Sequence, residues 1–153
     1  MTFLLVEDDP YDVFFVEREF KQASVNAILR VVRDGVEAID YLAGRGDRGN
    51  RENHPLPDVI LLDWELPRMG GREFLQWLRC ESPARQRSIP VVILCCSALH
   101  AEELAKADDG GGSLHLIKPL VWHQFEQQLQ TVGISVSAPA APPRNEFRRC
   151  GPA

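Results

Sequence analysis

The sequence has no apolar run long enough to cross a membrane, and its first apolar run, Phe3–Val6, is followed at once by three acidic residues. A membrane-spanning helix needs about 20 consecutive apolar residues, and a secretory signal needs an uninterrupted apolar region of about 7 to 15 residues. The pattern therefore excludes both, and we expect a cytoplasmic protein without a membrane partner.

An excess of positive charge is also missing. The 17 Lys and Arg residues are outnumbered by 22 Asp and Glu residues, which gives a formal net charge of −5. Proteins that bind nucleic acids usually carry a basic patch or stripe. We therefore expect no nucleic-acid partner.

Cysteine is scarce, and its spacing is not that of a metal or redox motif. The four cysteines are Cys80, Cys95, Cys96 and Cys150, with no CxxC pair among them. Cys95 and Cys96 close an apolar run, where small buried thiols are common. We interpret all four as reduced structural cysteines, as expected in the cytosol.

Five short apolar runs alternate with segments of helical periodicity, within a length of 153 residues that suits one domain. This alternation predicts an α/β fold with a doubly wound parallel sheet and helices on both faces. We assign the domain to residues 1–135 and expect a flexible tail rich in Ala, Pro and Arg over 136–153. The runs expected to form strands are Phe3–Val6, Ala27–Val32, Val59–Leu62, Val91–Leu94 and Leu114–Ile117.

The connection from Gly44 to Pro57 is unusually long and rich in Gly, Arg and Asn. Connections of this length are either mobile or bind a partner. A solvated loop is the simpler interpretation. Because the segment has no apolar residue before Leu56, we expect its shortening to cost little stability.

Charged and polar residues follow the predicted strands where each strand ends. Because the carboxyl ends of parallel strands meet at one edge of the sheet, these residues are expected to share a pocket. A carboxylate that closes a buried strand, as Asp63 does, is costly without a cation or hydrogen bonds. The residues expected in this pocket are Glu7, Asp8, Asp63, Ser97 and Lys118.

Three carboxylates in close contact repel each other, so this pocket favours a cation. Ligands that are all oxygen, without His or Cys, suit Mg²⁺, which often shares its site with a phosphate. A lysine and a hydroxyl opposite the ion would hold phosphoryl oxygens. An aspartate in this setting can act as a nucleophile and become an aspartyl phosphate.

These motifs resemble the receiver domain of bacterial two-component response regulators. The resemblance covers roughly residues 1–133 and implies a flavodoxin-like five-stranded sheet of order 2-1-3-4-5. The motifs that carry it are Leu4–Asp9, Asp63 with Leu66-Pro67 and Gly71, Ser97-Ala98, and Lys118-Pro119.

The resemblance implies a role for each of these residues. Asp63 would accept the phosphoryl group, and Glu7, Asp8, Asp63 and the main-chain carbonyl of Glu65 would hold Mg²⁺. Ser97 would bind the phosphoryl group and report its presence, and Lys118 would pair with it. From the sequence itself, a short helix beginning at Glu102 and the glycines that follow predict that the segment from Glu102 to Ser113 is a mobile output element that phosphorylation orders. His115 stands where the family usually has Tyr or Phe, and Gly110-Gly111-Gly112 also departs from the family pattern, which bears on switching.

The resemblance further implies a histidine kinase as donor, and the long Gly44–Pro57 connection is similar to that of regulators that serve phytochrome-type kinases. Output would pass through a downstream protein or a histidine phosphotransfer partner, and a homodimer is compatible with such a role. We expect a switch rather than an enzyme. Two alternatives remain: a Mg²⁺-dependent phosphohydrolase of the haloacid-dehalogenase type, and an interaction module that works without phosphorylation.

Overall fold

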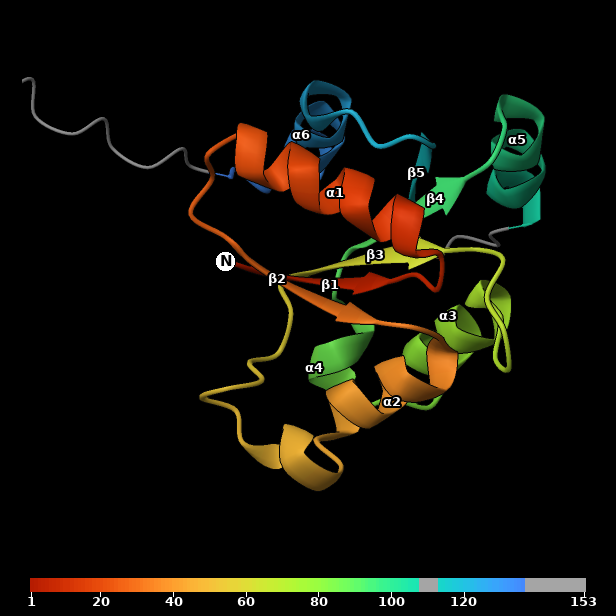
Figure 1. Cartoon of the computed structure of the whole chain (residues 1–153). Coiled ribbons are helices and arrows are strands. Elements are labelled where there is room, and N and C mark those ends of the chain that lie inside the picture. The colour runs from red at the N-terminus through yellow and green to blue at the C-terminus, as the bar shows by residue number, and fades with distance from the viewer. Residues whose placement is uncertain (108–112, 137–153) are drawn as a thin grey trace, which may run out of the picture.

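The computed structural model describes residues 1–107 and 113–136, which form a five-stranded parallel sheet flanked by helices (Figure 1). The strands lie in the order β2-β1-β3-β4-β5, which confirms the predicted fold class. The strands are β1 (Thr2–Val6), β2 (Ile28–Val32), β3 (Val59–Asp63), β4 (Val91–Cys95) and β5 (Leu114–Ile117). The helices are α1 (Pro10–Gln22), α2 (Gly35–Ala43), η1 (Gly46–Gly49), α3 (Gly71–Cys80), α4 (Ala84–Arg87), α5 (Ala98–Ala107) and α6 (Trp122–Thr131).

The three central strands are buried on both faces, which explains their unbroken apolar sequences. Alternate side chains enter two separate cores. On one face, Phe3 and Leu61 pack against α1 and α6, where Phe20 and Phe125 lie. On the other face, the strands pack against the apolar residues of α2, α3 and α5.

The helices begin and end with local signals that the sequence carries. The Asp9 carboxylate accepts a hydrogen bond from the Tyr11 N–H at 2.8 Å, and Pro10 is the first residue of α1. Proline costs nothing at that position because its missing N–H would have had no helical partner. Gly44 ends α2 in the left-handed conformation that glycine adopts without strain (φ 68°).

The structure departs from the expected elements at several places. The short helices η1 and α4 were not predicted, and α5 begins at Ala98 rather than near Glu102. Val136, expected as the first residue of the tail, packs in the core that α1 and α6 cover. The remaining tail, with Cys150, and Gly110-Gly111-Gly112 lie outside the described residues. Within the described part of the chain, no helix combines the length and apolar character needed to cross a membrane.

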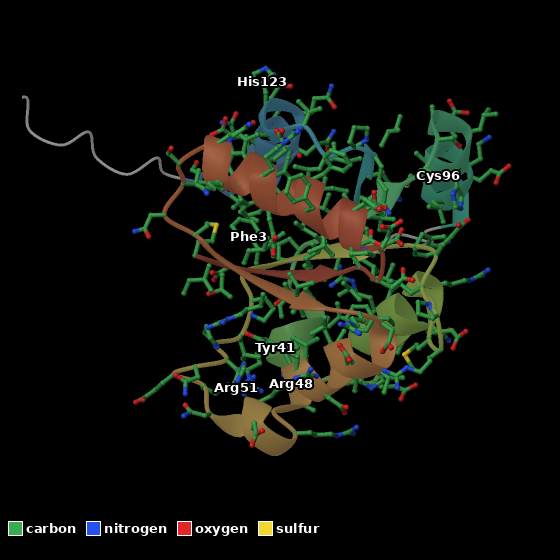
Figure 2. All side chains as sticks on the ribbon, in the orientation of Figure 1. Phe3, Tyr41, Arg48, Arg51, Cys96 and His123 are labelled. Carbon is green, nitrogen blue, oxygen red and sulfur yellow. The ribbon has the colours of Figure 1, made fainter. Side chains whose placement is uncertain are left out.

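The Gly44–Pro57 segment is held along its length, which corrects the expectation of a loop anchored only at its ends. The Arg51 guanidinium donates to the carbonyls of Tyr41 at 2.9 Å and Leu42 at 2.7 Å, and so occupies the last carbonyls of α2. The Tyr41 hydroxyl in turn donates to the Pro55 carbonyl at 2.9 Å. Figure 2 shows Tyr41 and Arg51 close together at this end of α2.

We therefore expect Arg51→Ala to lower the free energy of unfolding by about 1.5–3 kcal/mol, because it removes charge-assisted hydrogen bonds to the end of a helix. Urea unfolding measures the change. Arg45→Ala is the matched control, since Arg45 forms an exposed ion pair with Asp40 at 3.0 Å and should cost no more than about 0.5 kcal/mol. Equal losses in the two variants would contradict the role of Arg51.

Candidate functional site

A pocket of about 300 Å³ lies at the edge of the sheet where β1, β3 and β4 end. The loops after these strands supply most of its walls, and Lys118 after β5 closes one side. The lining residues are Glu7, Asp8, Asp9, Asp12, Asp63, Trp64, Glu65, Leu94, Cys96, His100 and Lys118.

Three of the predicted carboxylates meet in this pocket. One oxygen from each of Glu7, Asp8 and Asp63 lies within 4.8 Å of the other two. Asp63 ends β3 and is 7% exposed, Glu7 follows β1 and is 1% exposed, and Asp8 is exposed. The parallel pairing of β1 with β3 brings the ends of these two strands side by side. The expected acidic cluster is thus present in the fold.

Lys118 makes ion pairs with three carboxylates at this edge. Its Nζ lies 2.7 Å from Glu7 Oε2, 2.8 Å from Asp12 Oδ2 and 3.2 Å from Asp63 Oδ1. The backbone of Lys118 is tied to β4, because its N–H donates to the Cys95 carbonyl at 2.8 Å. The peptide bond that follows, to Pro119, is cis.

Asp12 was not predicted as part of the site. It lies in the first turn of α1, which begins directly after the Glu7-Asp8-Asp9 turn, and its carboxylate pairs with Lys118 in the pocket. No sequence signal distinguishes Asp12 from the other acidic residues of this helix.

Burial and crowding shift the pKa values of the charged groups in this pocket. Loss of hydration on burial raises the pKa of Glu7 to about 7, against the opposing hydrogen bond from Lys118. Burial likewise raises the pKa of Asp63, although the positive charge of Lys118 opposes the shift. For Lys118, burial alone would lower the pKa, but hydrogen bonds to Asp12 and Glu7 raise it above its usual value. The metal-free pocket therefore retains protons that a cation would displace.

The donor atoms of this cluster fit Mg²⁺. The three side chains offer only carboxylate oxygens, the hard ligands that this ion prefers. Burial, which raises the pKa values of Glu7 and Asp63, penalises their negative charges, and a bound cation would offset that penalty. Glu7, Asp8 and Asp63 could therefore hold the ion, and Glu65, which also lines the pocket, offers its main-chain carbonyl.

Gly71 allows the loop after β3 to fold back tightly against Asp63. A Cβ atom at Gly71 would lie 2.8 Å from the Asp63 carbonyl oxygen and 2.9 Å from Trp64 Cα, closer than real contacts allow. The Gly71 N–H donates to the Trp64 carbonyl at 3.1 Å and closes the loop. Only glycine leaves room for this arrangement, which places Trp64 and Glu65 in the pocket wall.

Ser97 is not among the residues that line the pocket, contrary to the prediction. Its Oγ accepts a hydrogen bond from the His100 N–H at 3.2 Å, so Ser97 is the N-cap of α5. β4 ends at Cys95, and Cys96, the first residue after it, lines the pocket. Ser97 lies one residue further along, just before α5.

His115 also lies away from the pocket. It pairs with Ile93, whose side chain belongs to the core that α2, α3 and α5 cover. This is the sheet face that α5 covers. A direct contact between His115 and a phosphoryl group on Asp63 is not provided by this geometry.

We expect the apparent affinity for Mg²⁺ to rise about tenfold between pH 6 and pH 8, because one proton with a pKa of about 7 on Glu7 competes with the ion. Since this pKa is raised from 4.5, the group stabilises the metal-free fold fully below pH 4.5 and loses that contribution as pH rises through about 7. Thermal unfolding without metal should therefore shift downward over this range.

Tryptophan fluorescence measures the Mg²⁺ titration, because Trp64 lines the pocket. Glu7→Gln should flatten the pH dependence, and Glu52→Gln, on an exposed carboxylate of the Gly44–Pro57 segment, should preserve it. An affinity that does not change with pH in the unsubstituted protein would contradict a proton on Glu7.

Comparison with known proteins finds a family model that matches most of the chain, and several similar proteins. A family model for the response regulator receiver domain matches residues 3–130. The chain is 32% identical over 129 residues to the probable methanogenesis regulatory protein FilR2 of Methanothrix harundinacea, which covers 84% of this chain and 79% of FilR2. It is 39% identical over 94 residues to response regulator Rcp1 of Synechocystis, which covers 61% of this chain and 60% of Rcp1.

Solved structures of response regulators are also similar to this chain over most of its length. The bacteriophytochrome response regulator RtBRR superposes with a TM-score of 0.79 at 35% identity, covering 94% of this chain and 84% of that one. The Mn(2+)-bound form of Rcp1 superposes with a TM-score of 0.64 at 29% identity, covering 90% of this chain and 99% of that one. The similarity therefore includes the sheet edge that carries the pocket.

Proposed function

Because the chain belongs to the family of response regulator receiver domains, we propose that it is a phosphoacceptor switch in which Asp63 receives a phosphoryl group from a histidine kinase. The observation that carries the proposal is the meeting of Glu7, Asp8, Asp63 and Lys118 in one pocket at the carboxyl edge of the sheet. These are the groups that phosphoryl transfer to a carboxylate requires: a nucleophile, ligands for a cation, and a fixed positive charge.

In the proposed reaction, an Asp63 carboxylate oxygen attacks the phosphorus atom of the donor. A new phosphorus–oxygen bond forms while the bond from phosphorus to the donor atom breaks, and the leaving group, an imidazole or acetate, carries away the bonding electrons. Because Asp63 is held at a strand end next to Lys118, little rearrangement is needed before attack. A bound Mg²⁺ would supply neutralisation of negative charge on the transferring oxygens.

Lys118 is proposed to change partners during this reaction. In the structure it pairs with Glu7, Asp12 and Asp63. Once a phosphoryl group is attached, its oxygens are the strongest acceptors near the lysine and draw Nζ toward them. The neutral form of Lys118 is disfavoured by the surrounding carboxylates, so the charge is retained throughout.

The cation is proposed to be Mg²⁺, held by Glu7, Asp8, Asp63 and the main-chain carbonyl of Glu65. The all-oxygen donor set supports a hard ion, and the Mn(2+)-bound form of the similar protein Rcp1 supports a divalent one. We further propose that Cys96, which directly follows β4 and lines the pocket, lies next to the phosphoryl group, the role that the sequence analysis gave to Ser97.

The donor is proposed to be a kinase of the phytochrome type, supported by the similarity to bacteriophytochrome response regulators. The response then passes to a downstream protein or a histidine phosphotransfer partner, with a homodimer as one form of the assembly. In this role the chain accepts one phosphoryl group and is not a turnover enzyme. A cytoplasmic location remains a prediction.

Two alternative functions, a phosphohydrolase and an interaction module that works without phosphorylation, are compared with the residues of this pocket. A phosphohydrolase of the haloacid-dehalogenase type would place a second aspartate two residues after the nucleophile as a general acid, and this chain has Glu65 there. An interaction module without phosphorylation has no need for the full charged set, which is present here. Neither alternative is favoured by a specific observation.

Incubation with acetyl phosphate and Mg²⁺, followed by intact mass spectrometry, separates these possibilities. The proposal predicts one phosphoryl group per chain, formed only with the divalent ion. Continuous release of phosphate from p-nitrophenyl phosphate would identify a phosphohydrolase. A mass that never changes would favour the interaction module.

A further inference from the structure

A second group of metal-ligating side chains lies beside the acidic cluster. Glu65, Cys96 and His100 each offer a ligand atom, and these three atoms lie within 4.8 Å of one another. Glu65 comes from the loop after β3, Cys96 follows β4, and His100 lies in the first turn of α5. All three line the pocket at the carboxyl edge of the sheet, and Figure 2 shows Cys96 beside α5.

The separation of Cys96 and His100 matches a shared metal ion. The distance between Cys96 Sγ and His100 Nδ1 is 3.5 Å. With a zinc–sulfur bond of about 2.3 Å, a zinc–nitrogen bond of about 2.0–2.1 Å and a tetrahedral angle, two such ligands are separated by about 3.5 Å. The two side chains thus already stand at the spacing of neighbouring corners of a zinc tetrahedron.

Ser97, which is not one of the three ligands, fixes the backbone between Cys96 and His100. The Ser97 Oγ accepts from the His100 N–H at 3.2 Å, and the Ser97 carbonyl accepts from the Ala101 N–H at 3.1 Å. This cap sets the first turn of α5, which presents His100 on the side of Cys96, four residues earlier. Ser97 is therefore a positioning residue for this pair.

The donor set differs in kind from that of the acidic cluster. A thiolate, an imidazole and a carboxylate together select a borderline ion such as Zn²⁺, whereas Glu7, Asp8 and Asp63 select a hard ion. Cys96 and Glu65 are exposed and His100 is half-buried, so an ion has access from solvent. Three protein ligands leave a fourth position for water, as in open zinc sites.

We propose that Glu65, Cys96 and His100 form a second metal site that binds Zn²⁺ or a similar thiophilic divalent ion next to the Mg²⁺ pocket. Glu65 serves both sites with different atoms, its carbonyl for one and its carboxylate for the other. A bound ion joins the loop after Asp63 to the first turn of α5.

Titration with Co²⁺ tests this site directly, because thiolate bound to Co²⁺ gives a near-ultraviolet charge-transfer absorption that oxygen ligands do not. The full chain is reduced, saturated with Mg²⁺ to fill the acidic cluster, and titrated with Co²⁺ alone. The proposal predicts the absorption with one Co²⁺ per chain and its loss when Zn²⁺ is added. Absence of the absorption overturns the proposal.

Variants assign the ligands. Cys96→Ser should abolish the absorption, and His100→Ala and Glu65→Gln should each weaken Co²⁺ binding about tenfold or more. Cys80→Ser, on another exposed cysteine, and Asp8→Asn, in the acidic cluster, should leave the absorption unchanged. An absorption that survives Cys96→Ser would mean that another thiol binds Co²⁺. An affinity for Co²⁺ that His100→Ala leaves unchanged would mean that Cys96 binds the ion without His100. Either result overturns the proposal.

Discussion

Asp63→Asn is expected to abolish phosphorylation by acetyl phosphate and, in the metal-free protein at pH 8, to raise the free energy of unfolding by about 1 kcal/mol. The first effect follows because an amide has no anionic oxygen to attack phosphorus. The second follows because burial raises the pKa of Asp63, so its charged form destabilises the fold above that pKa. An amide of the same shape removes this charge and the repulsion with Glu7.

Intact mass spectrometry and thermal unfolding measure the two effects on the same sample. Asp58→Asn is the matched control, since Asp58 lies outside the pocket and accepts a hydrogen bond from the Thr2 N–H at 2.7 Å. It should label normally and gain no stability. Persistent labelling of the Asp63→Asn protein would contradict the assignment of the acceptor, and a loss of stability would contradict the charge repulsion.

Lys118→Met is expected to cost the metal-free protein about 2–3 kcal/mol and to slow labelling by acetyl phosphate at least about tenfold. The substitution leaves Glu7, Asp12 and Asp63 without the ammonium group that lies 2.7–3.2 Å from each of them. The stability cost stays moderate because Glu7, whose pKa is already about 7, can take up a proton instead.

Urea unfolding with and without Mg²⁺ checks this prediction. The ion should restore part of the lost stability, because it replaces the missing positive charge in the same pocket. Lys21→Met is the control, since Lys21 is exposed at the end of α1. An Lys118→Met protein as stable and as fast in labelling as the Lys21 variant would show that the ion pairs seen here have no role.

Most of the fold could be predicted because its signals are local. The buried strands are unbroken apolar runs, and alternation with helical segments leaves few topologies for a parallel sheet. The acidic cluster followed from the same reasoning. Glu7 and Lys118 come directly after strands and Asp63 is the last residue of one, so any parallel arrangement of those strands brings them to one edge.

The incorrect or missing predictions depend on features that sequence patterns do not determine. Whether Cys96 or Ser97 lines the pocket depends on how the chain turns between the end of β4 at Cys95 and the beginning of α5 at Ala98, which the local sequence does not determine. Asp12 and Arg51 act through partners far along the chain or on the preceding helix, Lys118 and the carbonyls of Tyr41 and Leu42. The polar composition of the Gly44–Pro57 segment therefore gave no sign that it was tied down.

The central claim is that Asp63 accepts the phosphoryl group, and locating the modified residue tests it most directly. The protein is phosphorylated with acetyl phosphate and Mg²⁺, reduced with borohydride, which converts an aspartyl phosphate to homoserine, and digested for peptide sequencing by mass spectrometry. The expected result is homoserine at position 63, with Asp8, Asp9 and Asp12 unchanged. Modification at any of those neighbours instead, with Asp63 intact, would contradict the assignment.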